Sequence, residues 1–181
     1  MRKLVYAINM TLDGCVDHTK FMPDEETFAY FTQLTRDADT FVYGRITYQL
    51  MVPYWPDTAK EDPSDEYAKA FDAVEKIVVF SKSLGSAEDE KTRIVRSGLK
   101  DEILKLKQEE GKNIFTGGVN LASQMAALGL IDEYHIVVLP IIAGEGRRLF
   151  EGINLEEKLQ LKLVESTVFK SGAVVLRYLK K

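Results

Sequence analysis

Cysteine is nearly absent from this chain of 181 residues, since Cys15 is the only one. A single cysteine excludes an intrachain disulfide and a cysteine-rich zinc site, so the fold must be stable without either. No apolar run approaches the roughly 20 residues that span a bilayer, and residues 1–9 are not followed by the long apolar segment of a signal peptide. We therefore expect a cytoplasmic protein with no membrane partner.

An excess of positive charge is also missing. The 24 Lys and Arg residues are outnumbered by 28 Asp and Glu residues, which gives a formal net charge of −4. Such a chain repels the phosphate backbone of nucleic acids unless its basic residues gather locally, so we expect no nucleic-acid partner. A small phosphate-bearing ligand held at a local site is compatible with this charge. With 45% hydrophobic residues, the chain is rich enough to form one core, and we expect a single domain over residues 1–181.

β-prone and amphipathic segments alternate up to Gly129. Strands are expected over residues 4–9, 40–43, 76–81, 93–96 and 112–115, and helices over 25–36, 45–51, 65–74, 100–109 and 116–128. Asp24 is the expected cap of the first helix, in which Phe28, Phe31 and Leu34 or Thr35 form a buried face. Residues 52–65 contain three of the five prolines and are expected to form a loop.

The pattern changes after Gly129, because the β-prone segments 133–142, 159–169 and 173–179 follow one another without helices. A parallel core followed by antiparallel strands accounts for both halves of the chain. The sequence therefore predicts a three-layer α/β/α fold, with a mixed and mostly parallel central sheet and antiparallel C-terminal strands.

Ligands of open α/β sheets bind where strands end and helices begin. At one such junction, Gly44 lets a ligand approach the backbone, and Arg45 and Thr47 add hydrogen-bond donors; the alternative is an ordinary helix entry with a solvated arginine. At a second junction, Ser81, Lys82 and Ser83 offer charge-assisted hydrogen bonds to a phosphate; the alternative is a polar turn.

The third junction, Gly117-Gly118, is the most specific. Two adjacent glycines between a buried strand and a helix leave room for a diphosphate or a ring against the backbone, although a tight turn would also require them. The sequence contains neither GxGxxG nor GxxxxGK[ST], so a standard dinucleotide fingerprint and a P-loop are not supported.

The order of these motifs is similar to that of the dihydrofolate reductase superfamily, and specifically to stand-alone members of its RibD C-terminal-domain branch. The resemblance covers nearly the whole chain and is carried by MTLDG, YGRIT, VVFSKSL, TGG and GLIDEYHIVVLPIIAGEGRRLF. It implies a dihydrofolate reductase-like fold that binds NADPH. The residues that match the family's cofactor loops are Ala7, Gly44, Arg45, Ile46, Thr47, Ser81, Lys82, Ser83, Thr116, Gly117, Gly118, Val119, Asn120 and Leu121. Residues 11–14 match a mobile loop that closes over the nicotinamide.

The resemblance also suggests a substrate pocket formed by Asp13, Thr27, Phe28, Phe31 and Trp55. The residues allow other roles: Asp13 could cap a loop, Phe28 and Phe31 could be core, and Trp55 could bury a homodimer contact. Dihydrofolate reductases anchor the pteridine with a carboxylate one turn before a pocket phenylalanine, and if Phe31 is that residue, Thr27 occupies the place of the acid. The riboflavin-pathway reductases carry an acid where this chain has Thr116.

These observations predict an NADPH-dependent oxidoreductase acting on a planar nitrogen heterocycle or its ring-opened relative. A riboflavin-pathway pyrimidine, as in 5-amino-6-(5-phosphoribosylamino)uracil reductases, is the first expectation for the substrate, and dihydrofolate or another pterin is the alternative. The second function hypothesis is a nucleotide-binding module with little turnover, because the sequence singles out no catalytic residue.

His135 lies in an alternating strand, where a packed histidine is the expectation. Asp13, Asp17 and His18 fit no metal-ligand spacing, so we expect no metal.

Overall fold

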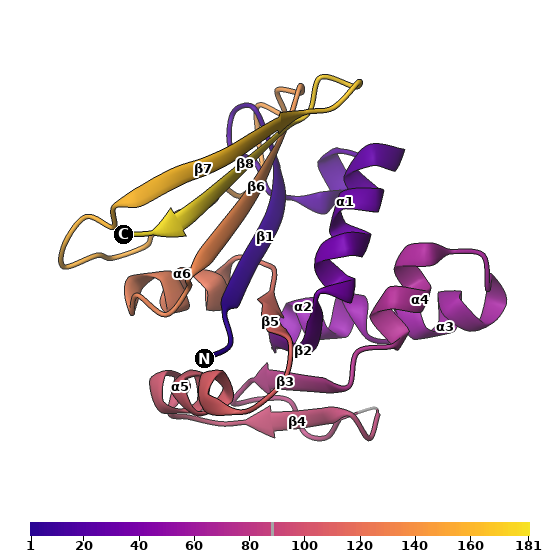
Figure 1. Cartoon of the computed structure of the whole chain (residues 1–181), viewed down its shortest axis with the longest axis vertical. Coiled ribbons are helices and arrows are strands. Elements are labelled where there is room, and N and C mark those ends of the chain that lie inside the picture. Colours follow the sequence, from indigo (N-terminus) through magenta and orange to yellow (C-terminus); the bar gives the residue numbers. More distant parts are fainter. Residues whose placement is uncertain (88) are drawn as a thin grey trace.

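The computed structural model describes residues 1–87 and 89–181, which form one eight-stranded sheet in the order β4-β3-β2-β5-β1-β6-β8-β7 (Figure 1). The strands are β1 (Leu4–Thr11), β2 (Ala38–Gly44), β3 (Lys76–Phe80), β4 (Thr92–Val95), β5 (Asn113–Thr116), β6 (Glu133–Leu139), β7 (Leu161–Val168) and β8 (Val174–Lys180). Strands β1 to β6 pair in parallel, whereas β8 is antiparallel to both β6 and β7. The predicted fold class is confirmed.

Helices cover both faces of the sheet. The α-helices are α1 (Glu25–Arg36), α2 (Arg45–Met51), α3 (Tyr54–Glu61), α4 (Glu66–Asp72), α5 (Leu99–Gln108) and α6 (Asn120–Ala127), and a 3₁₀ turn, η1, spans His18–Lys20. Figure 1 shows α5 and α6 on one side of the strands and α1 to α4 on the other. Three layers of secondary structure result, as expected for an α/β fold.

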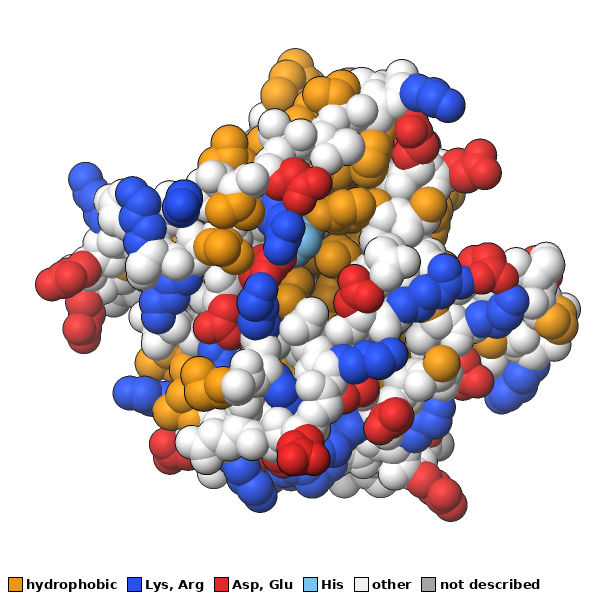
Figure 2. All heavy atoms as spheres, viewed as in Figure 1, with side chains coloured by type: hydrophobic (Ala, Val, Ile, Leu, Met, Phe, Trp, Pro, Cys, Tyr) orange, Lys and Arg blue, Asp and Glu red, His pale blue; other side chains and the backbone are white. Residues whose placement is uncertain are grey.

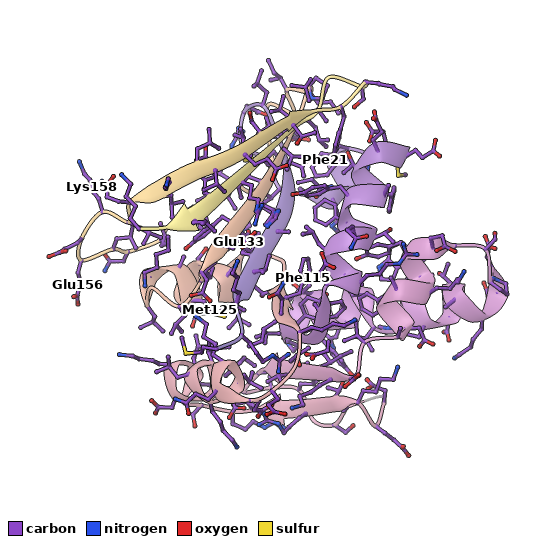
Figure 3. All side chains as sticks on the ribbon, in the orientation of Figure 1. Phe21, Phe115, Met125, Glu133, Glu156 and Lys158 are labelled. Carbon is purple, nitrogen blue, oxygen red and sulfur yellow. The ribbon has the colours of Figure 1, made fainter. Side chains whose placement is uncertain are left out.

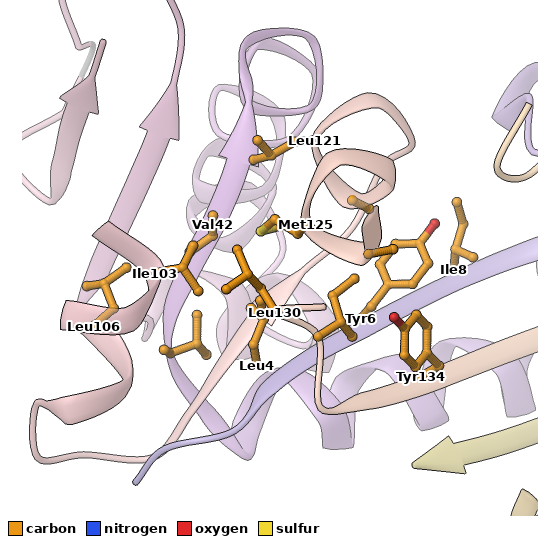
Figure 4. Close-up of a cluster of buried hydrophobic side chains, with 14 of the residues drawn as sticks. Leu4, Tyr6, Ile8, Val42, Ile103, Leu106, Leu121, Met125, Leu130 and Tyr134 are labelled. Carbon is orange, nitrogen blue, oxygen red and sulfur yellow. The ribbon is translucent and has the colours of Figure 1, made fainter. Parts of the chain in front are cut away.

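Alternation along the strands supplies a hydrophobic core to each face. Tyr6 of β1 and Val42 of β2 pack with Ile103 of α5 and Met125 of α6 in one cluster (Figure 4). The neighbouring residues of the same strands, including Ala7, Phe41 and Tyr43, pack in a second cluster beneath α1, α2 and α4. The central strands are therefore buried on both faces, which explains their nearly continuous apolar sequences.

Helix α1 has the predicted bounds, and the Asp24 carboxylate accepts a hydrogen bond from the Thr27 backbone N–H, as expected of the cap. Its buried face agrees with the prediction at Thr35 and differs from it at Phe28 and Phe31. The fully buried residues are Thr27, Thr32 and Thr35, whereas the phenylalanines are only partly buried. Helix α1 packs against α4 as well as the sheet, so small side chains occupy the closest contacts and aromatic rings fill the margins.

The prediction of a loop over residues 52–65 is wrong, because α3 forms within it. Pro53 is the N-cap residue and Pro56 lies in the first turn, where the missing backbone N–H has no intrahelical partner to lose. The prolines therefore start this helix instead of breaking it. Strand β6 ends at Leu139, three residues before the expected limit of 142, because Pro140 has no N–H to continue the ladder.

Within the described residues, no helix combines the length and the apolar character needed to cross a membrane.

Candidate functional site

The three junctions singled out in the sequence meet at the carboxyl ends of the parallel strands. They line one cleft of about 710 Å³. Its walls include Gly44, Arg45, Ile46 and Thr47 after β2, Ser81 and Lys82 after β3, and Gly117, Gly118, Val119, Asn120 and Leu121 after β5. The volume lies within the range of small-molecule sites. The strand order places these junctions together although they are far apart in the sequence.

The two glycines after β5 have different structural roles. Gly118 has φ +77°, and a Cβ there would collide with the Thr47 hydroxyl, so glycine is required by the backbone itself. Gly117 has no such restriction, and a Cβ on it would lie 3.6 Å from the Ala7 carbonyl oxygen, an ordinary contact. The turn alone therefore explains Gly118 but does not explain Gly117.

The cleft is electropositive although the chain is acidic. Its lining contains the cations Arg45, Lys82, Arg96 and Arg147, and among the described lining residues the only carboxylate is Asp17. Helix α6 begins in the cleft at Asn120, and its N-cap residue Val119 provides no side-chain hydrogen bond to the first turn. Unpaired N–H groups at a helix N-terminus attract anions. The arrangement suits a ligand with several negative charges.

Sequence reasoning missed one wall of the cleft. Arg96, Ser97 and Gly98 follow β4 and line the cleft beside Ser81. The Arg96 guanidinium donates to the Ser81 carbonyl at 3.0 Å and to the Gly85 carbonyl at 3.3 Å, which braces the loop after β3. The signal was available, because residues 96–98 run from the last residue of the predicted strand 93–96 toward the predicted helix 100–109 and so satisfy the rule that selected the other junctions.

Three predicted cofactor residues lie outside the cleft lining. The backbone N–H of Ser83 donates to Ser81 Oγ at 3.2 Å, so Ser83 closes a turn behind that residue. Thr116 is fully buried and donates its hydroxyl to the Val42 carbonyl at 2.7 Å, which joins β5 to β2. Ala7 is buried in the sheet next to Gly117. The Thr116 side chain is thus used structurally, and Ser83 and Thr116 both lie outside the cleft wall in which they were expected.

Asp13 joins two loops at the edge of the cleft. Its carboxylate accepts hydrogen bonds from the Thr11 hydroxyl at 2.5 Å and from the Ala143 and Gly144 backbone N–H groups at 3.1 and 3.0 Å. It also pairs with Arg148 at 2.7 Å. The bond from Thr11, followed by that from Arg148, holds the pKa of the Asp13 carboxyl well below its usual range. These contacts agree with the loop-cap alternative and leave this carboxylate engaged away from a substrate.

The aromatic residues predicted for the substrate pocket gather elsewhere. Phe28 and Trp55 both contact Tyr67 of α4, with ring centroids 6.2 and 4.5 Å apart. Thr27 is fully buried, and Phe31 lies where two core clusters meet. None of these residues lines the cleft, and Trp55 packs against the core cluster beneath α1, α2 and α4.

Among the residues that the structure describes, no group of three or more His, Cys, Asp and Glu side chains is arranged to hold a metal ion. Asp17 and His18 line the cleft instead, and Asp17 accepts hydrogen bonds from Thr19 in the turn η1.

Comparison with known proteins finds a family whose model matches nearly the whole chain. The RibD C-terminal domain family matches residues 2–175. The uncharacterized protein YyaP of Bacillus subtilis (strain 168) is 30% identical over 181 residues, covering 98% of this chain and 94% of YyaP. A protein ascribed to riboflavin biosynthesis from Shewanella sp. PV-4 superposes with a TM-score of 0.75 at 20% identity, covering 99% of each chain.

A third similar protein is longer than this chain. The diaminohydroxyphosphoribosylaminopyrimidine deaminase/5-amino-6-(5-phosphoribosylamino)uracil reductase of Thermotoga maritima superposes with a TM-score of 0.70 at 17% identity. The match covers 99% of this chain and 57% of the Thermotoga protein. At these identities the two solved structures support the fold alone.

Proposed function

Because the chain belongs to the RibD C-terminal domain family, we propose that it is an NADPH-dependent oxidoreductase that reduces a riboflavin-pathway pyrimidine. The observation that carries this proposal is the cleft, in which four cations face a single described carboxylate in a chain of net charge −4. A dinucleotide that carries a diphosphate and a 2′-phosphate has the charge that such a site neutralises.

The residues present fit NADPH at both of its charged ends. The N-terminus of α6 and the neighbouring Gly117 would hold the diphosphate, since no Cβ fills the space against the backbone. Lys82 and Ser81 would hold the 2′-phosphate. Ser81 Oγ already accepts from the Leu84 N–H at 2.9 Å, so its hydroxyl proton is available for donation. NADPH supplies a hydride when bound, and the protein positions the ring and limits water around it.

The choice of a pyrimidine over dihydrofolate depends on the first helix. Thr27 is neutral and buried at the place where folate enzymes carry an acid. The adjacent Glu26 does not replace it, because its carboxylate accepts a hydrogen bond from the Lys170 backbone N–H at 2.7 Å, in the turn between β7 and β8. A pteridine would therefore lose a charge-assisted pair of hydrogen bonds. The Thermotoga protein is described as a uracil reductase, which supports the pyrimidine class.

The test measures the oxidation of NADPH in the presence of 5-amino-6-(5-phosphoribosylamino)uracil, and the loss of NADPH absorbance reports the rate. We expect turnover with this compound, much slower turnover with dihydrofolate, and weak activity when NADH replaces NADPH. Tight NADPH binding without oxidation across a panel of pyrimidines and pterins would instead favour a nucleotide-binding module. Failure to bind NADPH would contradict the proposal.

A further inference from the structure

The eight arginines of the chain fall into two groups. Five form ion pairs with carboxylates: Arg2, Arg36, Arg93, Arg148 and Arg177 pair with Asp39, Glu66, Glu102, Asp13 and Glu133. Figure 3 labels the last of these carboxylates on β6, and Figure 2 shows basic and acidic side chains interspersed over the face in view. Among the residues that the structure describes, Arg45, Arg96 and Arg147 have no carboxylate partner, and all three line the cleft.

Neutral groups hold each arginine of the cleft. Arg45 donates to the Gln49 side chain at 2.9 Å, and Arg96 donates to two backbone carbonyls. Arg147 donates to the side-chain oxygen of Asn120. A neutral oxygen satisfies a guanidinium N–H but does not neutralise the charge. The cleft therefore keeps three permanently charged groups available for an anion, in a chain that is acidic overall.

Arg147 enters the cleft from a different part of the fold than the other cations. Lys82 and Arg96 follow β3 and β4, whereas Arg147 belongs to the segment after β6. Its contact with Asn120, the first residue of α6, places the guanidinium near the Gly117-Gly118 junction after β5. Strand β2 separates β3 from β5, so these two strands are about 10 Å apart. Cations at two separate places suit a ligand with two separate anionic groups.

The segment that carries Arg147 is joined to the loop after β1. The Val16 N–H donates to the Arg147 carbonyl at 2.9 Å, and the Leu149 N–H donates to the Gly14 carbonyl at 2.9 Å. These bonds lie on either side of an antiparallel bridge and form a short ladder between the two loops. We call residues 12–20 and 140–149 the loop pair.

Packing and charge connect the loop pair at further points. Gly146 has φ +93°, and a Cβ on it would lie 2.6 Å from the Sγ of the fully buried Cys15. Lys20 and Glu145 form an ion pair at 2.5 Å. The peptide before Arg147 thus packs directly on the loop after β1, which itself contributes residues 16–18 to the cleft. The position of the Arg147 backbone is therefore coupled to that of this wall.

The neighbouring arginine has a different role. Arg148 pairs with the Asp13 carboxylate at 2.7 Å and also donates to the Asp13 carbonyl. Successive side chains of an extended segment point to opposite sides, so Arg148 faces the loop after β1 and Arg147 faces the cleft. One arginine holds the loop pair together, and the other is left for a ligand.

We propose that Arg147 binds the diphosphate of NADPH together with the N-terminus of α6, and that this contact holds the loop pair against the bound cofactor. The inference rests on the proposed function. When the diphosphate enters, the guanidinium exchanges the neutral oxygen of Asn120 for anionic ones. Hydrogen bonds between charged groups are roughly twice as strong as neutral ones, and the planar guanidinium contacts two phosphate oxygens at once.

Titration calorimetry with Arg147→Gln tests the contact, because this variant removes the charge and keeps an amide. The dissociation constant for NADPH should rise at least tenfold. The constant for NADH should rise by the same factor, since both cofactors contain the diphosphate. Lys82→Ala should instead weaken NADPH alone. Arg93→Gln is the matched control, because it removes an exposed arginine that pairs with Glu102 outside the cleft, and both constants should change less than about twofold.

The outcomes separate this inference from the proposed function. If the wild type binds NADPH and Arg147→Gln binds it equally well, the inference is wrong and the proposed function stands. The same holds if Arg147→Gln raises only the KM for the phosphorylated pyrimidine, because the guanidinium would then bind the substrate. If the wild type binds neither NADPH nor NADH, the proposed function itself fails.

Amide hydrogen exchange tests the effect on the loop pair. The Val16 and Leu149 amides make the bonds that join the two loops, and saturating NADPH should slow their exchange in the wild type. The same amides should gain much less protection in Arg147→Gln when it is also saturated with NADPH. The Lys69 amide of α4, which bonds within its own helix turn, is the control. Equal protection in both proteins would show that Arg147 does not hold the loop pair.

Discussion

A substitution at Gly117 distinguishes a role in cofactor binding from a role in the backbone turn more clearly than a substitution at any other position in the cleft. In Gly117→Ala the new methyl group meets the Ala7 carbonyl oxygen at an ordinary 3.6 Å, and the φ of Gly117 is not in the positive range. The folded protein should accept the methyl group, and its free energy of unfolding should change by less than about 1 kcal/mol, since the alanine also restricts the unfolded chain. The methyl group would nevertheless occupy the space assigned to the diphosphate.

We therefore expect Gly117→Ala to bind NADPH at least tenfold more weakly, a loss of about 1.4 kcal/mol, while its thermal midpoint stays near that of the wild type. Gly118→Ala is the matched comparison. Its methyl group would collide with Thr47 at φ +77°, so this variant should lose stability as well as affinity, at a cost of about 1–2 kcal/mol for the backbone strain alone. Titration calorimetry and thermal unfolding measure both quantities. A stable Gly117→Ala with unchanged NADPH affinity would refute the reasoning.

Three further predictions concern the cofactor's phosphate, the loop contact and the substrate. Lys82→Ala should weaken NADPH by about 1.5–3 kcal/mol and leave NADH nearly unchanged; equal losses in calorimetry would count against the 2′-phosphate assignment. Asp13→Asn should speed hydrogen exchange at the Ala143 and Gly144 amides. Because the pKa of Asp13 is lowered in the folded protein, its stabilisation is present above the unfolded pKa and should be lost only in strong acid; an unaltered exchange rate would show that the contact is dispensable. Thr27→Asp should lower the thermal midpoint and leave dihydrofolate turnover slow, because Thr27 is fully buried and lies outside the cleft lining, and fast dihydrofolate turnover by the wild type would show that no acid is needed.

Much of the fold followed from hydrophobic pattern because the central strands are buried on both faces. Residues 76–81 illustrate this: a continuous apolar run predicted a covered strand, and β3 has helices on both sides. The Asp24 cap was equally direct, since capping depends on a few adjacent residues. Local signals of this kind need no knowledge of tertiary contacts.

The prediction of secondary structure and burial failed where the effect of a residue depends on its position within a helix. Prolines 53 and 56 suggested a loop, yet at the start of α3 they cost the helix nothing. Composition alone could not distinguish these two cases. The threonines of α1 are buried because α1 packs against both α4 and the sheet. The contact between α1 and α4 joins two segments whose sequences give no sign that they pack together.

The site was predictable to the extent that it consists of strand ends. The strand-end rule brought Gly44, Lys82 and Gly117 into one cleft, and applied once more it would have found Arg96. The hydrogen-bonded group formed by Tyr30, His135 and Glu133 was beyond such reasoning. Tyr30 and His135 are 105 positions apart, and only the register of β6 with β1 brings the imidazole beneath α1.

A crystal structure of the protein with NADPH bound tests the central claim most directly. The account predicts the diphosphate at the N-terminus of α6 against Gly117, the 2′-phosphate at Ser81 and Lys82, and the nicotinamide ring beside Ala7. The account would be contradicted if NADPH bound outside the cleft. It would also be contradicted if the cleft stayed empty in crystals soaked with a large excess of NADPH.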